Sequence, residues 1–366
     1  MGDADLTMGG CWIGWKPIST NVRVASSRLR CLEPLSELRS RGYSVETFNP
    51  NHVDRYAAVI YSKAYDDLSY REATGLQKRG IRVVFDLCDN HFYNPRGLSY
   101  WKQAAKRLRR MMATANELVA STEALAEVMV EELSDGRHVT VIGDAVETEI
   151  RGWVAPVWQR WYHERKLSRL LEELGEDRER GIIPIVWFGH HGSPYAEGGM
   201  LDLLSIRPLL EKMNRRYPLT LTVISNSRKR YHKAIEPWSI STRYLAWHPE
   251  TFFPALRAHA LAVIPISVNP FTRCKSNNRV ALSLHMGLAV VADSIPSYLA
   301  FGEACYLDAW ETGLETYLSN PDLRGRHVEI GRAIIAQDWT LARIADRWHD
   351  LFGRLRAQAQ RYEKLL

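Results

Sequence analysis

Residues 261–294 decide the fold of this chain: LAVIPISVNPFTRCKSNNRVALSLHMGLAVVADS. Two apolar runs, 261–266 and 288–293, have the length and the composition of buried strands. Between them a polar loop leads into the helical segment VALSLHM, which ends at Gly287. Two buried strands connected through a helix predict a βαβ unit of a parallel sheet.

The same alternation extends in both directions from this unit. It breaks between about residues 145 and 180, where we expect a connection that contains one helix. Strands are predicted at 11–15, 43–48, 57–62, 81–87, 117–121 and 138–143, and then at 183–189, 219–225, 243–247, 261–266, 288–293 and 304–308. Helices between many of them, and a last helix at about 340–364, predict an α/β protein with two halves of similar size. In such folds, ligands bind at the carboxyl ends of the strands.

The composition narrows the class of protein. A length of 366 residues fits about two domains, and 46% apolar with 25% charged residues is ordinary for globular proteins. The net charge of +6 and the sequence pI of about 9.0 suit anionic substrates or an anionic lipid surface, and do not require nucleic acid. We expect no nucleic-acid partner.

The cysteines and the N-terminus predict a compartment. No apolar run approaches 18 residues, the first ten residues lack the apolar core of a signal peptide, and Leu6 stands where myristoylation needs Ser or Thr. The cysteines are scattered and form no CxxC pair, which argues against a disulfide framework or a zinc site: Cys11, Cys31, Cys88, Cys274 and Cys305. We therefore expect a soluble cytoplasmic protein.

The loop 275–279, KSNNR, is the main candidate for ligand binding. It places cationic, hydroxyl and amide groups at the start of a helix, where unpaired backbone N–H groups and the helix dipole favour an anion. The alternative is that Lys275 and Arg279 are simply solvated there.

With these elements in this order, the sequence resembles GT-B glycosyltransferases of the large retaining nucleotide-sugar group. The donor-binding segment of that family runs strand, proline, Lys-Ser-x-x-Lys element, helix, glycine and apolar strand. Other stretches resemble further parts of the family: IVWFGHHGS (185–193), YLAWHPETFFPALRAHALAVIPI (244–266), LVASTEALAEVM (118–129), VTVIGDAVE (139–147), SSRLRCLEPLSELRSRG (26–42) and DLCDNHF (86–92). The resemblance implies two Rossmann-like domains that face a cleft. Residues 1–165 would be the acceptor domain, 180–338 the nucleotide-sugar donor domain, and 339–366 a helix that packs back toward the N-terminal domain.

The sequence departs from the family at its acidic pair. Most members carry two glutamates at the positions of Cys274 and Leu282, and an Arg and a Lys-Gly pair where this chain has a His-His and a Glu-Gly-Gly sequence. We therefore assign the donor site to other residues, led by the two cations for the diphosphate: Lys275, Arg279, Ser276, Asn278, Gly189, His190, Gly192, Trp247 and His248.

Asp86, Asp89 and His91 follow the strand 81–87 and are the candidate catalytic residues. Carboxylates and an imidazole at a strand end suit hydroxyl recognition and general-base catalysis, with Asp86 placed to support the loop. The alternative is that Asp86 caps a turn and His91 lies on the surface. We expect no metal, because the resemblance implies metal-independent chemistry.

Arg28 and Arg30 are candidates for binding an anionic group of the donor or acceptor. The alternative is that they pair with Glu33 or Glu37 on the helix surface. For Trp247, the alternative to stacking on the donor base is a place in the core.

Two basic segments predict a contact with an anionic membrane at the inner face. One is the helix face of residues 102–110, and the other is 151–169, where arginines alternate with tryptophans. The alternative is a solvated surface with the tryptophans packed between the domains, which we favour for Trp153.

The function that these observations favour is a glycosyltransferase that needs no cofactor beyond its nucleotide-diphosphate sugar. The acceptor would be a hydroxyl of a glycan, a lipid-linked or a small molecule, and the resemblance implies retention of configuration. The rival hypotheses are a non-catalytic GT-B protein that binds a nucleotide or sugar or joins a glycan-assembly complex, a sugar-nucleotide epimerase, and a nucleic-acid-binding protein.

Overall fold

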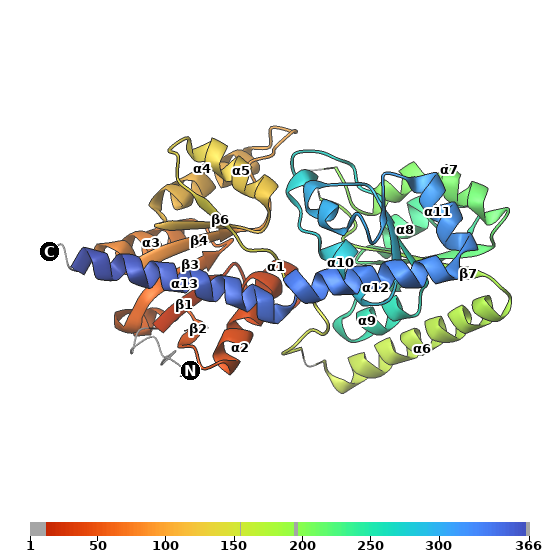
Figure 1. The fold of residues 1–366 in the computed structure, drawn as a ribbon, viewed down its shortest axis with the longest axis horizontal. Helices are drawn as coiled ribbons and strands as arrows, with labels where there is room; N and C mark the ends of the chain where they lie inside the picture. The colour runs from red at the N-terminus through yellow and green to blue at the C-terminus, as the bar shows by residue number, and fades with distance from the viewer. Residues whose placement is uncertain (1–11, 154, 194–196, 364–366) are drawn as a thin grey trace. The chain divides into compact units, whose positions relative to one another are not determined.

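The computed structural model describes residues 12–153, 155–193 and 197–363, which Figure 1 shows as a ribbon. Cys11 and Leu6 lie outside the described residues. The chain divides into two compact units: Met1–Ala145 with Cys274–Ser276 and Asp338–Leu366, and Val146–Arg273 with Asn277–Gln337. The first unit thus ends at Ala145 rather than at residue 165, because the segment from Val146 onward packs with the second unit.

The first unit contains a six-stranded parallel sheet in the order β2-β1-β3-β4-β5-β6. Its strands are β1 Trp12–Pro17, β2 Val45–Thr47, β3 Tyr56–Ser62, β4 Arg82–Leu87, β5 Glu117–Ala120 and β6 Val139–Val141. The strand order reverses between β1 and β3, and ligands of open parallel sheets bind at the carboxyl ends beside such a switch point.

The helices of this unit are α1 Ala25–Ser27, η1 Arg28–Leu32, α2 Glu33–Ser40, η2 Pro50–Arg55, α3 Asp67–Lys78, α4 Ser99–Thr114, α5 Glu123–Leu133 and α13 Leu341–Glu363. Thr122 caps α5, because its hydroxyl accepts a hydrogen bond from Leu125 N at 3.2 Å. The helical segment between β1 and β2 contains a π-helical turn, η1. Four consecutive residues at its start are buried, which is more than the stripe of a regular α-helix would bury.

Helix α13 completes one face of the first sheet. Trp348 and Phe352 of α13 belong to the core cluster that also contains Trp15 of β1. The rings of Trp15 and Trp348 meet edge to face, with their centroids 4.7 Å apart. The C-terminal helix is therefore part of the hydrophobic core of the first unit.

The second unit also contains a six-stranded parallel sheet, in the order β12-β11-β10-β7-β8-β9. Its strands are β7 Ile183–Phe188, β8 Leu219–Ser225, β9 Ser241–Ala246, β10 Leu261–Ile264, β11 Ala289–Ala292 and β12 Tyr306–Leu307. Its switch point lies between β7 and β10. The strands predicted from the sequence are all present, with ends that differ by a few residues, because continuous apolar runs are typical of strands buried on both faces.

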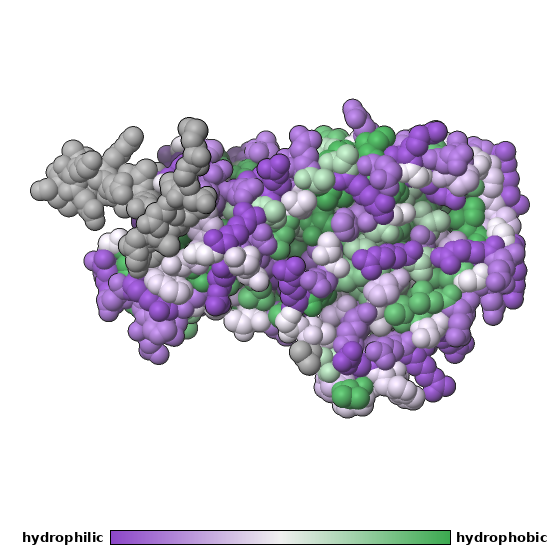
Figure 2. Space-filling model, turned by 60° about the horizontal axis from the view of Figure 1, so that its bottom comes forward, coloured by the Kyte–Doolittle hydropathy of each residue, from purple (hydrophilic) through white to green (hydrophobic). Residues whose placement is uncertain are grey.

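Helices cover both faces of this second sheet. They are α6 Val157–Glu179, η3 Met200–Asp202, α7 Leu203–Asn214, α8 Arg228–Ala234, α9 Pro249–Arg257, η4 Thr272–Cys274, α10 Asn278–His285, η5 Pro296–Phe301, α11 Trp310–Ser319 and α12 Pro321–Asp338. Among the helices that the structure describes, none is long and apolar enough to cross a bilayer. Hydrophilic side chains cover much of the face seen in Figure 2, with smaller hydrophobic patches between them.

Candidate functional site

The switch point of the second sheet gathers most of the predicted donor residues. Gly189, His190 and Gly192 follow β7, and the loop after β10 leads into α10. Trp247 and His248 follow β9, at the same carboxyl edge of the sheet. Because all the strands are parallel, their carboxyl ends meet at one edge, which is where α/β proteins bind ligands.

The loop after β7 requires glycine at two positions where the backbone turns on itself. Gly192 and Gly199 both have positive φ, at 128° and 95°. A Cβ on Gly199 would lie 2.6 Å from the Cα and N atoms of Gly192, which no side chain tolerates. Because glycine has no side chain, this loop presents bare backbone beside the strand ends, as phosphate-binding loops require.

Helix α8 and the residue that follows β8 hold this loop from one side. Arg230 Nη1 donates a hydrogen bond to His191 O at 2.7 Å, and the His191 ring meets Asn226 Oδ1 at 2.8 Å. Gly192 N donates to Nδ1 of His190 at 3.3 Å. His190 therefore supports the loop conformation, and its contact with a donor stays a prediction.

Arg279 of α10 lies beside the first glycine of the loop. A Cβ placed on Gly189 would be 3.7 Å from Nη1 of Arg279. At the start of the same helix, Asn277 makes no capping hydrogen bond, and its buried Nδ2 has no hydrogen-bond partner among the residues described. A cation and an uncapped helix start, next to bare backbone, can bind an anion. Asn278 is half-buried in the first turn of this helix.

Asp202 is a residue of this site that the sequence analysis missed. Its buried carboxylate accepts hydrogen bonds from Gly199 N at 2.8 Å and from Ser267 Oγ at 2.5 Å. Burial raises the pKa of Asp202, while these bonds and the charge of Arg279 oppose that rise. Asp202 thus connects the glycine loop to the loop after β10, and its charge interacts with that of Arg279. Its position three residues after the Gly198–Gly199 pair and directly before a helix was the signal for it.

His248 and Trp247 are held by their own surroundings. His248 is buried, its Nδ1 accepts a hydrogen bond from Glu250 N at 3.4 Å, and its ring stacks on His163 with centroids 3.6 Å apart. Trp247 is half-buried and packs near Phe252 with ring centroids 6.1 Å apart. Because Trp247 is only partly covered, it is not a fully buried core residue. Its stacking on a donor base stays a prediction.

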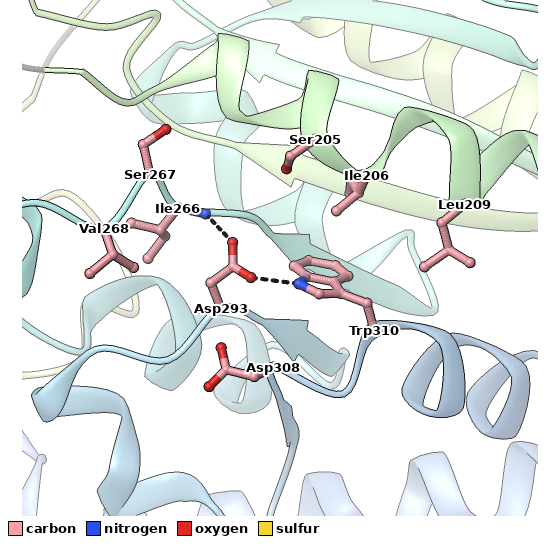
Figure 3. A pocket seen from close by; sticks show the side chains of 9 residues that line it. All are labelled: Ser205, Ile206, Leu209, Ile266, Ser267, Val268, Asp293, Asp308 and Trp310. Atoms are coloured by element: carbon pink, nitrogen blue, oxygen red, sulfur yellow. Dashed lines mark hydrogen bonds between the residues drawn. The ribbon is translucent and has the colours of Figure 1, made fainter.

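A cavity of about 390 Å³ lies at the carboxyl ends of β10, β11 and β12 (Figure 3). Asp293 organises it, because its carboxylate accepts hydrogen bonds from Ile266 N at 2.7 Å and from Trp310 Nε1 at 2.6 Å. Ser267, which also lines the cavity, binds Asp202. The full lining is Ser205, Ile206, Leu209, Ile266, Ser267, Val268, Asp293, Asp308 and Trp310.

In the first unit, Asp89 is bound by two lysines. Lys63, which follows β3 at the switch point, and Lys275 both form ion pairs with its carboxylate. Burial would raise the pKa of Asp89, but the two lysines hold it well below its usual range. Lys275 and Ser276 belong to the first unit, so Lys275 meets Asp89 instead of lying solvated at a helix start. Two lysines thus meet one buried carboxylate at the carboxyl edge of the first sheet.

His91 lies beside this cluster and is buried, which excludes a surface position. Its Nδ1 is 2.6 Å from the hydroxyl of Tyr65, and its ring packs against Trp101. Burial, together with the charge of Lys63, lowers the pKa of His91 to about 4, so its imidazole is neutral at pH 7. Within the described part of the chain, no three His, Cys, Asp or Glu residues are arranged to hold a metal ion.

Arg30 and Asp86 form a buried ion pair, so Arg30 does not lie where the sequence analysis placed it, and Asp86 has a supporting role, toward Arg30 and not only toward its own loop. Arg30 Nη2 and Nε contact the carboxylate of Asp86 at 2.5 and 3.2 Å, and Nη1 contacts Asp144 at 3.0 Å. Burial by itself lowers the pKa of Arg30, but the two carboxylates outweigh it and raise the pKa. Arg30 is fully occupied inside the fold, and Asp86 supports it instead of facing a substrate.

Arg28 is also buried and does not lie on the helix surface. Its Nη1 donates a hydrogen bond to Val22 O at 2.6 Å, in the loop that follows β1. The alternative pairing with Glu33 or Glu37 is wrong for Arg30, because Arg30 pairs with Asp86 and Asp144. The π-helical segment η1 turns both arginines inward.

The two basic segments that predicted a membrane contact differ in their surroundings. On α4, Arg107 and Arg110 pair with Asp67, and Arg109 pairs with Glu132. Three of the five cations of that face are therefore paired, with two carboxylates between them. The segment 151–169 belongs to the second unit, not to the N-terminal one as expected.

The GT-B fold is defined by two Rossmann-like units, each with its polar residues at the carboxyl edge of a parallel sheet. The chain has this fold. No protein-family model and no curated protein matches the sequence. Among solved structures, a glycosyltransferase from Rickettsia africae ESF-5 matches with a TM-score of 0.62 at 12% identity, over 94% of this chain and 98% of that one.

Two further solved structures show the same fold. TarM matches with a TM-score of 0.57 at 14% identity over 81% of this chain, which spans only 54% of TarM. An E. coli structure described as trehalose-6-phosphate bound with UDP-2-fluoro glucose matches with a TM-score of 0.54 at 16% identity, over 95% of this chain and 92% of that one. The fold predicted from the sequence is confirmed.

Proposed function

We propose that this chain is a glycosyltransferase that transfers a sugar from a nucleotide-diphosphate sugar to an acceptor hydroxyl, with retention of configuration. The observation that carries the proposal is the position of Arg279 beside the bare backbone of Gly189 and the uncapped start of α10. A structure of the same fold contains UDP-2-fluoro glucose, and another, of a TarM mutant, contains UDP and alpha-GlcNAc-glycerol. These ligands match the chemistry of the site.

In the second unit, the donor diphosphate would bind where positive charge and N–H groups converge. Arg279 would contact the phosphates, and the glycine loop would approach them with backbone N–H groups. Asp202 holds both in place through Gly199 N and through its charge facing Arg279. Stabilisation of the departing diphosphate would then be electrostatic, by groups already oriented before the reaction.

The first unit would contribute electrostatic interactions, not proton transfer, through the cluster of Lys63, Asp89 and Lys275. The low pKa of Asp89 makes it a weak base, and the two lysines beside it suit the binding of an anionic group. His91 is neutral and close to Tyr65, so it can orient a hydroxyl by hydrogen bonding. The acceptor would be a hydroxyl of a glycan, a lipid-linked or a small molecule.

Calorimetry with UDP, GDP, dTDP and ADP tests the donor site. Lys275→Ala and Arg279→Ala should each weaken binding of the preferred nucleotide by about 1.5–3 kcal/mol, the value of a hydrogen bond to a charged group. Arg273→Ala is the control, because it removes an equal charge from an exposed position of the same loop. Equal affinities in all three variants and the natural sequence would contradict the assignment.

A second candidate is a GT-B protein that binds a nucleotide or sugar without transferring it. Cys274 and Leu282, at the positions of the family's acidic pair, carry no acidic group and are both buried. Release of free nucleotide from the preferred sugar donor, measured with a panel of glycan and lipid-linked acceptors, distinguishes the two. Tight binding with no turnover on any acceptor would favour the binder.

A further inference from the structure

The start of α6 carries an exposed cluster of large apolar and aromatic side chains, which we call the aromatic face. The exposed fractions are 82% for Val157, 69% for Trp158, 63% for Trp161 and 48% for Tyr162. Soluble proteins rarely expose such side chains together unless the surface binds something. Figure 1 shows α6 as an outer helix of the second unit.

The aromatic face is not what attaches α6 to its unit. The opposite side of the helix does this, where Leu170 and Leu174 are buried and His163 stacks on His248 of the loop before α9. At 100° per residue, these attachment positions lie on the far side of the helix from Trp158 and Trp161. The aromatic face is therefore available to a partner.

The charges next to the aromatic face indicate an anionic partner. The guanidinium of Arg165 lies over the ring of Trp161 at 5.7 Å, and the ammonium of Lys166 lies over the ring of Tyr162 at 4.7 Å. Arg160 and Arg169 of the same helix pair with Glu250 and Glu173, whereas Arg165 and Lys166 form no ion pair with a carboxylate among the residues described. These two positive charges are therefore not neutralised within the unit.

A second copy of this chain is the alternative partner of the aromatic face. An antiparallel pair of α6 helices would place the basic half of one copy against the acidic half of the other. In the acidic half, Glu173 and Asp177 already pair with Arg243, at 3.0 and 2.5 Å, so their charge is satisfied inside the unit. The carboxylates that such a pair would use are Glu172, Glu176 and Glu179, which are exposed.

We propose that the aromatic face of α6 binds an anionic lipid bilayer and attaches the second unit to it. Trp158, Trp161 and Tyr162 would lie at the level of the lipid headgroups, and Arg165 and Lys166 would bind the lipid phosphates. Tryptophan and tyrosine concentrate at membrane interfaces, and cations beside them bind anionic lipids. The proposal goes beyond glycosyl transfer and does not depend on it.

Sedimentation with lipid vesicles tests the proposal on the full chain. The protein should pellet with vesicles of equal parts phosphatidylglycerol and phosphatidylcholine at low salt, and stay in solution with phosphatidylcholine alone. Trp158→Ala/Trp161→Ala and Arg165→Ala/Lys166→Ala should each lower the partition coefficient about tenfold or more. High salt should release the protein, because screening weakens the charge term.

Matched variants in the second unit control for the general loss of apolar surface and charge. Leu299→Ala removes another exposed apolar side chain, and Lys229→Ala/Lys233→Ala removes two exposed charges from α8. Both should pellet like the natural sequence, and circular dichroism should show all variants folded. The proposal is overturned if the natural protein stays in the supernatant, if the α6 variants bind as well as the controls, or if gel filtration shows a dimer that Trp158→Ala/Trp161→Ala dissociates.

Discussion

Replacing Arg30 by methionine should remove the centre of a buried charge network in the first unit. Beyond its contacts with Asp86 and Asp144, Arg30 Nη1 donates hydrogen bonds to Ile142 O at 2.6 Å and Gly143 O at 3.1 Å. The guanidinium therefore ties α1–η1–α2 to β4 and to the segment after β6. Without it, the carboxylate of Asp86, which has no exposed side-chain surface, becomes a buried charge with no counter-charge beside it.

The expected loss in the free energy of unfolding is about 3–5 kcal/mol, the usual cost of breaking a buried ion pair from one side. The matched control is Arg41→Met. Arg41 also contacts two acidic residues, Glu37 at 2.9 Å and Asp346 at 2.6 Å, but it is partly exposed. Exposed pairs contribute about 0–1 kcal/mol, so the control should differ little from the natural sequence.

Urea unfolding followed by circular dichroism measures both values. If Arg30→Met does not fold, Asp86→Leu gives the same information from the other partner. The double variant Arg30→Met/Asp86→Leu should lose less free energy of unfolding than the two single variants lose together. The reason is that an apolar pair leaves no unpaired charge between these two positions. If Arg30→Met is as stable as Arg41→Met but loses nucleotide binding, Arg30 is a ligand-binding residue and the reasoning is wrong.

The remaining predictions concern pH, two glycines and Asp202. Burial lowers the pKa of His91 and of His259 to about 4, so each contributes stability that is complete above about pH 6.5 and is lost as the pH falls toward 4. Urea unfolding should therefore show a loss of about 2 kcal/mol for each imidazole between pH 7 and pH 5, and an unchanged midpoint would contradict this. Gly143→Ala should destabilise the protein by about 1–3 kcal/mol, because its Cβ would lie 2.4 Å from the ring of Trp339. Gly175→Ala in α6 meets nothing within 4 Å and should stabilise the protein by up to about 1 kcal/mol. Thermal unfolding measures both, and shifts of the same sign would be evidence against the packing argument. Asp202→Asn keeps the shape of the side chain but removes the charge that faces Arg279. It should therefore weaken binding of the preferred nucleotide about tenfold in calorimetry, with the melting temperature nearly unchanged. An affinity equal to that of the natural sequence would show that Asp202 does not position the site.

The alternation of strands and helices could be predicted from the sequence because it depends on local patterns. A strand buried on both faces reads as a continuous apolar run, and the runs 81–87 and 261–266 did so without any knowledge of their neighbours. Polar residues that follow such runs must lie at the carboxyl edge of the sheet. This is why the positions of Gly189, Arg279 and Asp89 at strand ends or helix starts could be expected.

The partners of the charged residues depended on the tertiary structure. Arg30 binds Asp86 and Asp144, which are 56 and 114 residues away along the chain. Lys275 pairs with Asp89 across 186 residues. A charged side chain at a helix start looks the same in the sequence whether it meets solvent, a ligand or a distant carboxylate. Only the packing of β4, η1 and the loop before α10 decides among these, because burial makes a charge take the counter-charge that the fold brings to it.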